Sequence, residues 1–263
     1  MRYPSDWMIR WTNMEHYLRN SMAEGDESSV DHVISLLRDE DWGVKHQAIV
    51  TLGNLGGEEA VNALVASLVY LHEDAGIGNQ WRLYHHNLPT LKKSLRDEFG
   101  KPLRLGLRAQ IIESIVNLND RRAVPPLVAF LNSEDKELRY CSMRILGRLG
   151  DERAVEPLIV MMNSAKNKEE RKNVQVALAN IGEVAVEPVT LAFKDERLKP
   201  YGQKSRLVTI AFAEVLGEIG DERAVGPLQD AIKDNNTKGS AAAAKALRKI
   251  LHTTKFRLSE KTE

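Results

Sequence analysis

Cysteine and histidine, the side chains that most often carry chemistry, are few in this chain and form no converging set. The single cysteine, Cys141, excludes a disulfide framework and any zinc site built from cysteine ligands. No partner base is readable beside it, so we expect a small packed residue rather than a nucleophile. One His-Glu dipeptide, His72-Glu73, and one histidine pair, His85-His86, occur, and neither has the further ligands that a metal needs. The sequence therefore predicts no catalytic residue, no metal site and no cofactor.

Basic residues mixed with aromatic ones offer a different chemistry, the binding of an acidic partner. They gather in two stretches of the chain, 75–102 and 194–206. Their lysines and arginines would attract acidic groups, and their aromatic rings would anchor or stack on a partner. The alternative is an ordinary solvated loop whose aromatic side chains pack onto the adjoining chain. The candidate binding residues in these stretches are Trp81, Arg82, Tyr84, Lys92, Lys93, Lys199, Tyr201 and Lys204.

The net charge of zero hides a separation of charge along the chain. Residues 1–74 carry 5 basic and 13 acidic side chains, and residues 75–263 carry 32 basic and 24 acidic ones. Such a separation marks either an interaction surface or a solvated face. No window approaches the apolar length of a membrane span, and the N-terminus lacks a signal-peptide run, so we expect a soluble, cytoplasmic protein.

An internal repeat dominates the sequence and determines where these residues lie. Three segments nearly coincide, and two weaker copies follow the same pattern, one of them a residue short. The strong copies are LGRLGDERAVEPL (146–158), LGEIGDERAVGPL (216–228) and VNLNDRRAVPPL (116–127), and the weaker ones LGNLGGEEAVNAL (52–64) and LANIGEVAVEPV (178–189). The copies predict a series of stacked units, with the two basic stretches as insertions between the paired helices of a unit.

The residues of each copy that end one helix and begin the next predict a pair of helices. A helical pattern ends at a glycine or asparagine, which adopts the left-handed C′ conformation, and an aspartate then caps the next helix. The second helix contains a proline, which we expect beyond its first turn as a kink. Leu146 and Leu216 are expected in the core. The first helices, which we call inner, are predicted at 42–56, 103–119, 138–150, 170–182, 206–220 and 240–252, and the prolines are Pro126, Pro157, Pro188 and Pro227.

These copies resemble the HEAT-like repeats of the phycobilisome-lyase type. The resemblance implies an all-α fold, an α-solenoid (superhelix) of about six HEAT-like helix pairs, with the inner helices lining a concave groove. It covers most of the chain, as a repeat solenoid over residues 29–252. The apolar stripe before it predicts an N-terminal capping helix (1–28), with an exposed docking helix as the alternative, and the polar residues after it predict a tail (253–263) that frays.

Three related families with this kind of repeat imply different activities. Deoxyhypusine hydroxylase binds a di-iron centre through His-Glu pairs on its inner helices, but here only His46 stands at such a position and Gln47 follows it. We cannot match the catalytic residues of HEAT-like DNA glycosylases. Bilin lyases of the E/F type have insertions within their repeats, which implies an alternative function in chromophore attachment or tetrapyrrole handling.

The groove side of the inner helices adds three candidate binding residues, Tyr140, Arg144 and Arg148. Together with Lys172 they make the middle of the groove locally basic. The basic residues do not continue along the groove, which argues against a track for duplex DNA. A further basic row at the second position of the inner helices is expected to pair with turn acids such as Asp120 and Asp151. That row is Lys45, Arg108, Arg139 and Arg171.

The sequence therefore predicts a non-catalytic protein-binding scaffold or adaptor. A solenoid offers a long preformed surface, and no converging catalytic group is visible. The expected partner is a protein with an acidic surface, whereas nucleic acid and membrane are not expected. The alternative, a bilin-lyase-like factor, would take a bilin or other tetrapyrrole as its ligand.

Overall fold

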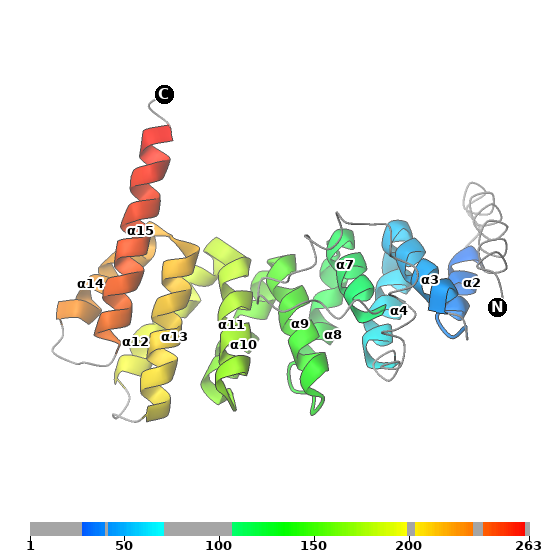
Figure 1. The fold of residues 1–263 in the computed structure, drawn as a ribbon, viewed down its shortest axis with the longest axis horizontal. Coiled ribbons are helices and arrows are strands. Elements are labelled where there is room, and N and C mark those ends of the chain that lie inside the picture. The colour runs from blue at the N-terminus through cyan, green and yellow to red at the C-terminus, as the bar shows by residue number, and fades with distance from the viewer. Residues whose placement is uncertain (1–27, 40–41, 71–106, 199–202, 234–238, 261–263) are drawn as a thin grey trace, which may run out of the picture. The chain divides into compact units, whose positions relative to one another are not determined.

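The computed structural model describes residues 28–39, 42–70, 107–198, 203–233 and 239–260. Every regular element in these ranges is an α-helix or a short 3-10 helix, with no strand (Figure 1). The chain divides into two compact units, Met1–Pro126 and Leu127–Glu263. Because the described elements are paired helices without a strand, the predicted all-α solenoid is confirmed.

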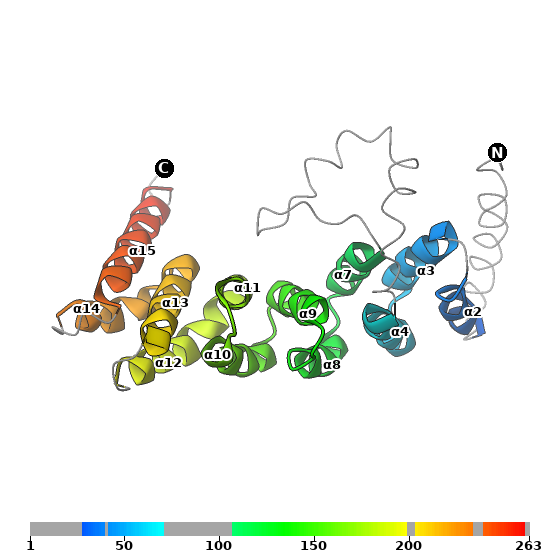
Figure 2. The same cartoon turned by 60° about the horizontal axis from the view of Figure 1, so that its bottom comes forward.

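Each unit has a layer of inner helices and a layer of outer helices (Figure 2). The inner helices are α3 (Trp42–Leu55) and α7 (Leu107–Leu118) in the first unit, and α9 (Lys136–Leu149), α11 (Lys168–Ile181), α13 (Gln203–Ile219) and α15 (Ser240–Glu260) in the second. The outer helices are α2 (Ser28–Leu36), α4 (Gly57–Tyr70), α8 (Val124–Phe130), α10 (Val155–Ser164), α12 (Val186–Leu198) and α14 (Val225–Lys233). The predicted inner helices match these bounds to within a few residues, apart from the end of α15.

The predicted positive φ at the ends of the inner helices is confirmed. Gly56, Gly150 and Gly220 have φ between 64° and 75°, and Asn119, the one asparagine at this position, has φ 48°. Gly182 has φ 82° but ψ −138°, so it ends its helix outside the left-handed helical conformation that was predicted. Leu251 occupies the same repeat position in the last copy, and α15 continues past it to Glu260. The helix thus extends into the polar tail, where no residue favours the left-handed conformation that stops a helix.

The aspartate caps are confirmed, but the proline kinks are not. The side chains of Asp120, Asp151 and Asp221 accept hydrogen bonds from the backbone N–H two residues on. Each caps a 3-10 turn, and the α-helix begins only after it, so that Pro157 is the third residue of α10. The first N–H groups of a helix have no intrahelical acceptor, so a proline there removes no hydrogen bond. The 3-10 turns are η2 (Arg121–Ala123), η3 (Glu152–Ala154), η4 (Gly182–Ala185) and η5 (Glu222–Ala224).

Three pairs of neighbouring inner helices meet at the glycine that is the second residue of the repeat motif. A Cβ atom at Gly147 would lie 2.8 Å from Ala177 Cα, and one at Gly217 would lie 2.8 Å from Ala246 Cα. In the first unit, a Cβ atom at Gly53 would lie 2.7 Å from Ser114 Cβ. The small residues on both sides let α3 approach α7, α9 approach α11, and α13 approach α15. Glycine is needed here for packing rather than for its backbone conformation.

Substituting Gly147 with valine is expected to destabilise the protein by about 1–3 kcal/mol, because the added methyl groups would have to displace the backbone of α11. Gly226 in α14 provides the control, since no atom lies within 4 Å of a Cβ there. Gly226→Ala is expected to stabilise the protein by up to about 1 kcal/mol through helix propensity. Urea denaturation measures both, and equal effects of the two substitutions would contradict the close approach of α9 and α11.

One described stretch, Lys168–Arg197, is long and apolar enough to span a membrane by length and composition, with a hydropathy of 1.4. No such stretch was expected from the sequence. The backbone turns at Gly182, between α11 and α12. Val174 on α11 and Phe193 on α12 are fully buried within the repeats. The apolar residues of this stretch therefore have a structural explanation as the core of two successive helices.

Candidate protein-binding face

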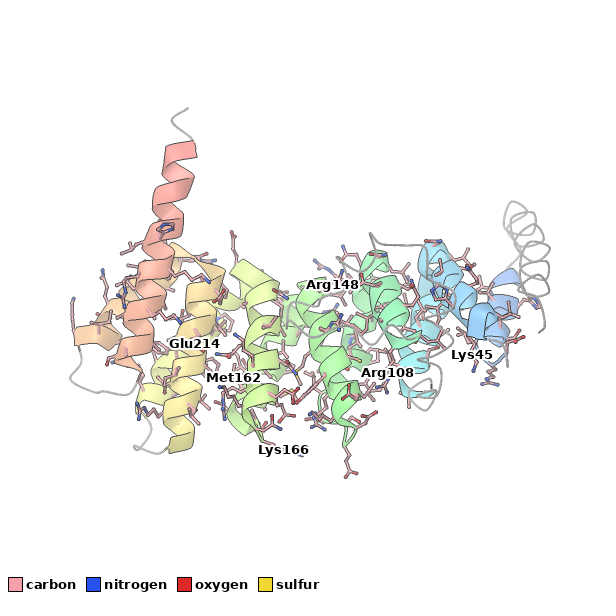
Figure 3. All side chains as sticks on the ribbon, viewed as in Figure 1. Lys45, Arg108, Arg148, Met162, Lys166 and Glu214 are labelled. Atoms are coloured by element: carbon pink, nitrogen blue, oxygen red, sulfur yellow. The ribbon has the colours of Figure 1, made fainter. Side chains whose placement is uncertain are left out.

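Three of the predicted binding residues lie in the described part of the chain, and all three are on α9. Tyr140, Arg144 and Arg148 follow one another at intervals of four residues and so share one side of the helix. Arg148 is exposed (Figure 3). Tyr140 and Arg144 are half-buried. The remaining candidates, Trp81, Arg82, Tyr84, Lys92, Lys93, Lys199 and Tyr201, and the side chain of Lys204, lie outside the described residues.

The neighbouring helix α11 extends this surface. Lys172 is exposed on α11 at the repeat position of Tyr140, and Asn180 is exposed at the repeat position of Arg148. Because α9 and α11 pack side by side, the two helices present one surface. We call the surface formed by Tyr140, Arg144, Arg148 and Lys172 the inner basic face.

The ring of Tyr140 is held in place by a charged neighbour. Lys136 Nζ lies 5.1 Å from the centroid of the ring and 2.9 Å from Glu169 Oε2 of α11. The hydrogen bond to Glu169 raises the pKa of Lys136. Burial, and next the negative charge of Glu169, raise the pKa of Tyr140, so its phenol stays neutral at physiological pH. Tyr140 therefore offers a neutral aromatic ring beside a fixed cation.

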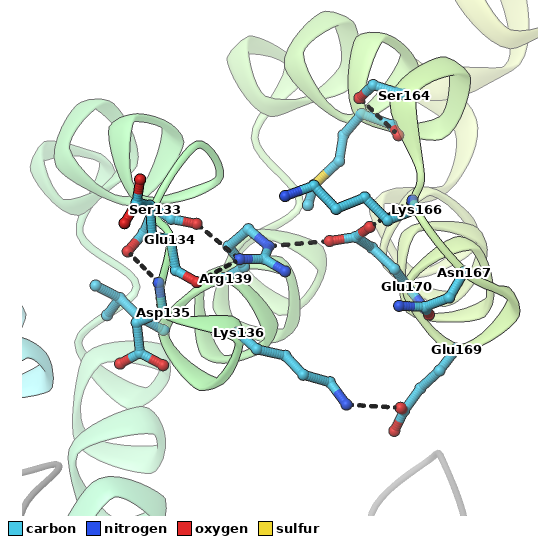
Figure 4. Close-up of polar contacts among 12 residues, drawn as sticks. Ser133, Glu134, Asp135, Lys136, Arg139, Ser164, Lys166, Asn167, Glu169 and Glu170 are labelled. Atoms are coloured by element: carbon cyan, nitrogen blue, oxygen red, sulfur yellow. Dashed lines mark hydrogen bonds and ion pairs between the residues drawn. The ribbon is translucent and has the colours of Figure 1, made fainter.

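A buried ion pair joins the beginnings of the same two helices. Arg139 Nε donates to Glu170 Oε1 at 2.9 Å, and the two side chains are only 10% and 3% exposed (Figure 4). Arg139 also donates to the carbonyl oxygens of Ser133 and Glu134, and Glu170 Oε2 accepts from the backbone N–H of Lys166. The guanidinium and the carboxylate thus have several hydrogen bonds each, as buried charges require.

The predicted pairing of the basic row with turn acids is therefore wrong for Arg139, whose ionic partner is Glu170 of the next inner helix. The turn acids instead hold the arginine two residues after them. Asp120 binds the guanidinium of Arg122 through both carboxylate oxygens, and Asp221 binds Arg223 in the same way. This short-range pairing is geometrically favoured because the capping aspartate already faces the backbone of that arginine. The basic row links neighbouring repeats at Arg139 rather than closing a turn.

The contacts between α9 and α11 fix both ends of the inner basic face. Arg139 and Glu170 join the N-terminal ends, and the approach of Gly147 to Ala177 sets the distance at the C-terminal ends. Tyr140 and Arg148 each lie one residue from these anchor points. A surface fixed in this way loses little conformational freedom when a partner binds, which favours affinity.

Farther along the inner layer, acidic side chains already have partners from neighbouring helices. Glu214 on α13 accepts a 2.6 Å hydrogen bond from the amide of Gln175 on α11, and Glu218 forms an ion pair with Lys249 on α15. Glu214 thus accepts from an amide of the preceding repeat, and Glu218 neutralises a lysine of the following one.

Comparison with protein families decides what kind of repeat this is. The family of HEAT repeats matches residues 20–74 and 88–179, more than half of the chain. The chain is a HEAT-repeat protein. A PBS lyase HEAT-like repeat also matches residues 210–234, within α13 and α14. The predicted HEAT-like repeat type is confirmed.

Several solved structures are similar to this HEAT-repeat protein at low identity. The complex of CpcE and CpcF of phycocyanin lyase from Nostoc sp. PCC7120 is 21% identical, with a TM-score of 0.41, over 81% of this chain and 74% of that one. Human deoxyhypusine hydroxylase in complex with glycerol is 16% identical, with a TM-score of 0.35, over 89% of this chain and 99% of that one. A designed armadillo repeat protein is 17% identical, with a TM-score of 0.36, over 83% of this chain and 98% of that one. Similarity at this level says nothing about what this chain binds. No curated protein sequence matches the chain.

The described surface of the HEAT-repeat protein carries groups that can bind a charged partner. Within the described ranges, no group of three or more His, Cys, Asp or Glu side chains could hold a metal ion. Cys141 is half-buried on α9, next to Tyr140. The inner basic face combines an aromatic ring, two guanidinium groups and an ammonium group, which is a set suited to carboxylates.

Reasoning from the sequence missed Lys136, Glu169 and Glu170, the residues that support this face. One signal was available, because Asn167 is followed three residues later by Glu170, the spacing of a capping box. In the structure Asn167 caps α11 by accepting from the backbone N–H of Glu170. That signal places the start of α11 at Lys168 and identifies Glu170 as a structural residue. The predicted start at 170 was therefore two residues late.

Proposed function

We propose that this HEAT-repeat protein is a non-catalytic protein-binding scaffold, and that its inner basic face binds an acidic segment of a partner protein. The observation that supports this best is the preorganisation of Tyr140, Arg144, Arg148 and Lys172 on two helices that are joined at both ends. A partner would find these groups in place, without first ordering the helices that carry them.

The chemistry of the face selects for carboxylates. Arginine binds a carboxylate through two parallel hydrogen bonds, and Tyr140 supplies an apolar ring for the stem of an acidic side chain or for a neighbouring aromatic residue. The exposed Arg148 and Lys172 would mainly attract the partner and set the salt dependence of association. The insertion residues Trp81, Arg82, Tyr84, Lys92, Lys93, Lys199, Tyr201 and Lys204 belong to the same proposal as further contacts.

A direct test uses a fluorescent peptide of alternating Glu and Asp with one Phe, compared with the same peptide carrying Gln and Asn. The wild type is expected to bind the acidic peptide more tightly, and the affinity is expected to fall as salt is added. Replacing both Arg144 and Arg148 with glutamate is expected to weaken binding by about tenfold or more, chiefly through slower association. The matched control is Lys245→Glu, an exposed inner-helix lysine on α15. Equal loss in the control, or equal binding of the neutral peptide, would contradict the proposed site.

The match of residues 210–234 to a PBS lyase HEAT-like repeat favours one second candidate, a bilin-lyase-like function in chromophore attachment or tetrapyrrole handling. In that function Arg144 and Arg148 would bind propionates, and Tyr140 would stack on the tetrapyrrole. Visible absorption spectra of the protein mixed with a bilin or haem separate the two functions. A saturable spectral shift that Tyr140→Ala abolishes would favour the tetrapyrrole, whereas unchanged spectra favour the protein-binding scaffold.

A further inference from the structure

The outer helices α10 and α12 expose large apolar side chains at equivalent positions. Val160 is 59% exposed and Leu191 is 62% exposed, and each is the sixth residue of its helix. The residues at this position in α8 and α14 are Ala129 and Asp230, which are smaller or charged. Single exposed apolar residues are common, but neighbouring ones at a repeated position form a patch. Helices α10 and α12 pack side by side, so the two residues belong to one surface.

A third apolar residue extends this surface where one repeat departs from the pattern. Val184 in η4 is 49% exposed and stands at the position that Arg122, Arg153 and Arg223 occupy in the other copies. In those copies the arginine binds the capping aspartate, but this copy is one residue short and lacks the aspartate. Val184 lies in the turn that leads directly into α12, the helix that carries Leu191. This repeat therefore has an exposed valine where the other copies have an arginine paired with the capping aspartate.

Carboxylates border the same surface. Glu156 and Glu187 are exposed one turn before Val160 and Leu191, and Glu183 is exposed beside Val184. At one edge Arg223 contacts the carboxylate of Glu187 at 3.4 Å and donates to the backbone carbonyl oxygen of Glu183 at 3.1 Å. We call Val160, Val184 and Leu191, with these three glutamates, the outer apolar strip.

We infer that the outer apolar strip is a second docking surface, and that it binds an amphipathic helix of a partner protein with leucine-type residues on one face and lysine or arginine beside them. The apolar side chains supply the driving force, because contact with the partner removes them from water. The three glutamates complement basic flanking residues and disfavour acidic ones. The strip is opposite in charge to the inner basic face, so the two surfaces select different ligands, as an adaptor between two partners requires.

The probe is a fluorescein-labelled amphipathic helix of about 18 Leu and Lys residues, long enough to form a stable helix on binding. Two control peptides share its length: one carries Glu in place of Lys, and the other has the same composition without an apolar face. In fluorescence anisotropy, the full chain is expected to bind the Leu/Lys helix at least about tenfold more tightly than either control. Leu191→Asn and Val160→Asn are each expected to weaken this binding by about tenfold, whereas Leu251→Asn, a 52% exposed leucine on α15, leaves it unchanged.

Several results would overturn the inference, and circular dichroism first confirms that each variant is folded. Unchanged binding in Leu191→Asn would show that the strip is not the site, and equal binding of the Glu-containing peptide would show that the carboxylates do not select the ligand. Dimerisation of the free protein that Leu191→Asn abolishes would assign the strip to a second copy of the chain. Cosedimentation with phosphatidylcholine vesicles, lost in the same variant, would assign it to lipid. The double variant of Arg144 and Arg148 should still bind the Leu/Lys helix, so failure of one surface is distinguishable from failure of the other.

Discussion

Replacing Glu170 with leucine is expected to lower the free energy of unfolding by about 3–5 kcal/mol, one of the largest effects of any substitution in this chain. The reason is the buried position of its partner, since the side chain of Arg139 is only 10% exposed. Without Glu170 the guanidinium keeps its charge but loses its counter-ion in a place that water hardly reaches. The backbone N–H of Lys166 loses its acceptor at the same time. Urea denaturation followed by far-UV circular dichroism measures the loss.

The double variant Arg139→Met, Glu170→Leu separates the two contributions. It removes both charges and fills the space with apolar side chains, so it is expected to recover most of the stability that Glu170→Leu loses. The neighbouring pair Lys136–Glu169 provides the matched control, because it joins the same two helices three residues before Arg139 and one residue before Glu170, but is exposed. Glu169→Gln is expected to change stability little, since water already solvates both groups. A loss as large as that of Glu170→Leu would mean that the two pairs are equally shielded from solvent, contrary to the structure.

The repeat motif was sufficient to predict most of the fold, because each of its residues has a local physical role. A left-handed residue ends a helix and an aspartate caps the next, and neither effect depends on distant parts of the chain. Gly150 and Asp151 illustrate this, since both adopt the predicted conformation and contact. The proline prediction was wrong for a local reason too. The 3-10 turn between Asp151 and Val155 shifts the start of the α-helix, and the sequence pattern did not distinguish that turn from the helix.

The candidate site was predicted less completely, because its support comes from contacts between repeats. Tyr140, Arg144 and Arg148 could be assigned to one side of a helix from their spacing alone. The partner of Arg139 could not, since Glu170 lies in another repeat and both helix bounds must be known to about a residue. The packing role of Gly147 could not be predicted from the sequence for the same reason. Its contact is with Ala177, and two small residues in separate helices do not reveal from sequence that they touch.

Leu146→Ala is expected to destabilise the protein by about 2–5 kcal/mol, and Leu216→Ala by a similar amount. Both leucines are fully buried and precede the glycine at which two inner helices meet. Because Gly147 and Gly217 already approach the next helix to van der Waals distance, the helices cannot move closer to fill the cavity that alanine leaves. The cost of a core truncation increases with the volume of the cavity that remains, so both values should lie in the upper half of this range.

The control for this prediction is Leu251→Ala on α15, where the leucine is 52% exposed and its truncation leaves no cavity. Urea denaturation of the three variants tests two statements together. A loss below about 1 kcal/mol in the free energy of unfolding at Leu146 or Leu216 would mean that the repeat register is wrong, because truncating a fully buried core leucine costs more than this. Losses at Leu146 and Leu216 that differ by several kcal/mol would instead show that the two seams, α9 with α11 and α13 with α15, differ in how far they can collapse. Equal and large losses are expected, since the same residues make the same contact in both repeats.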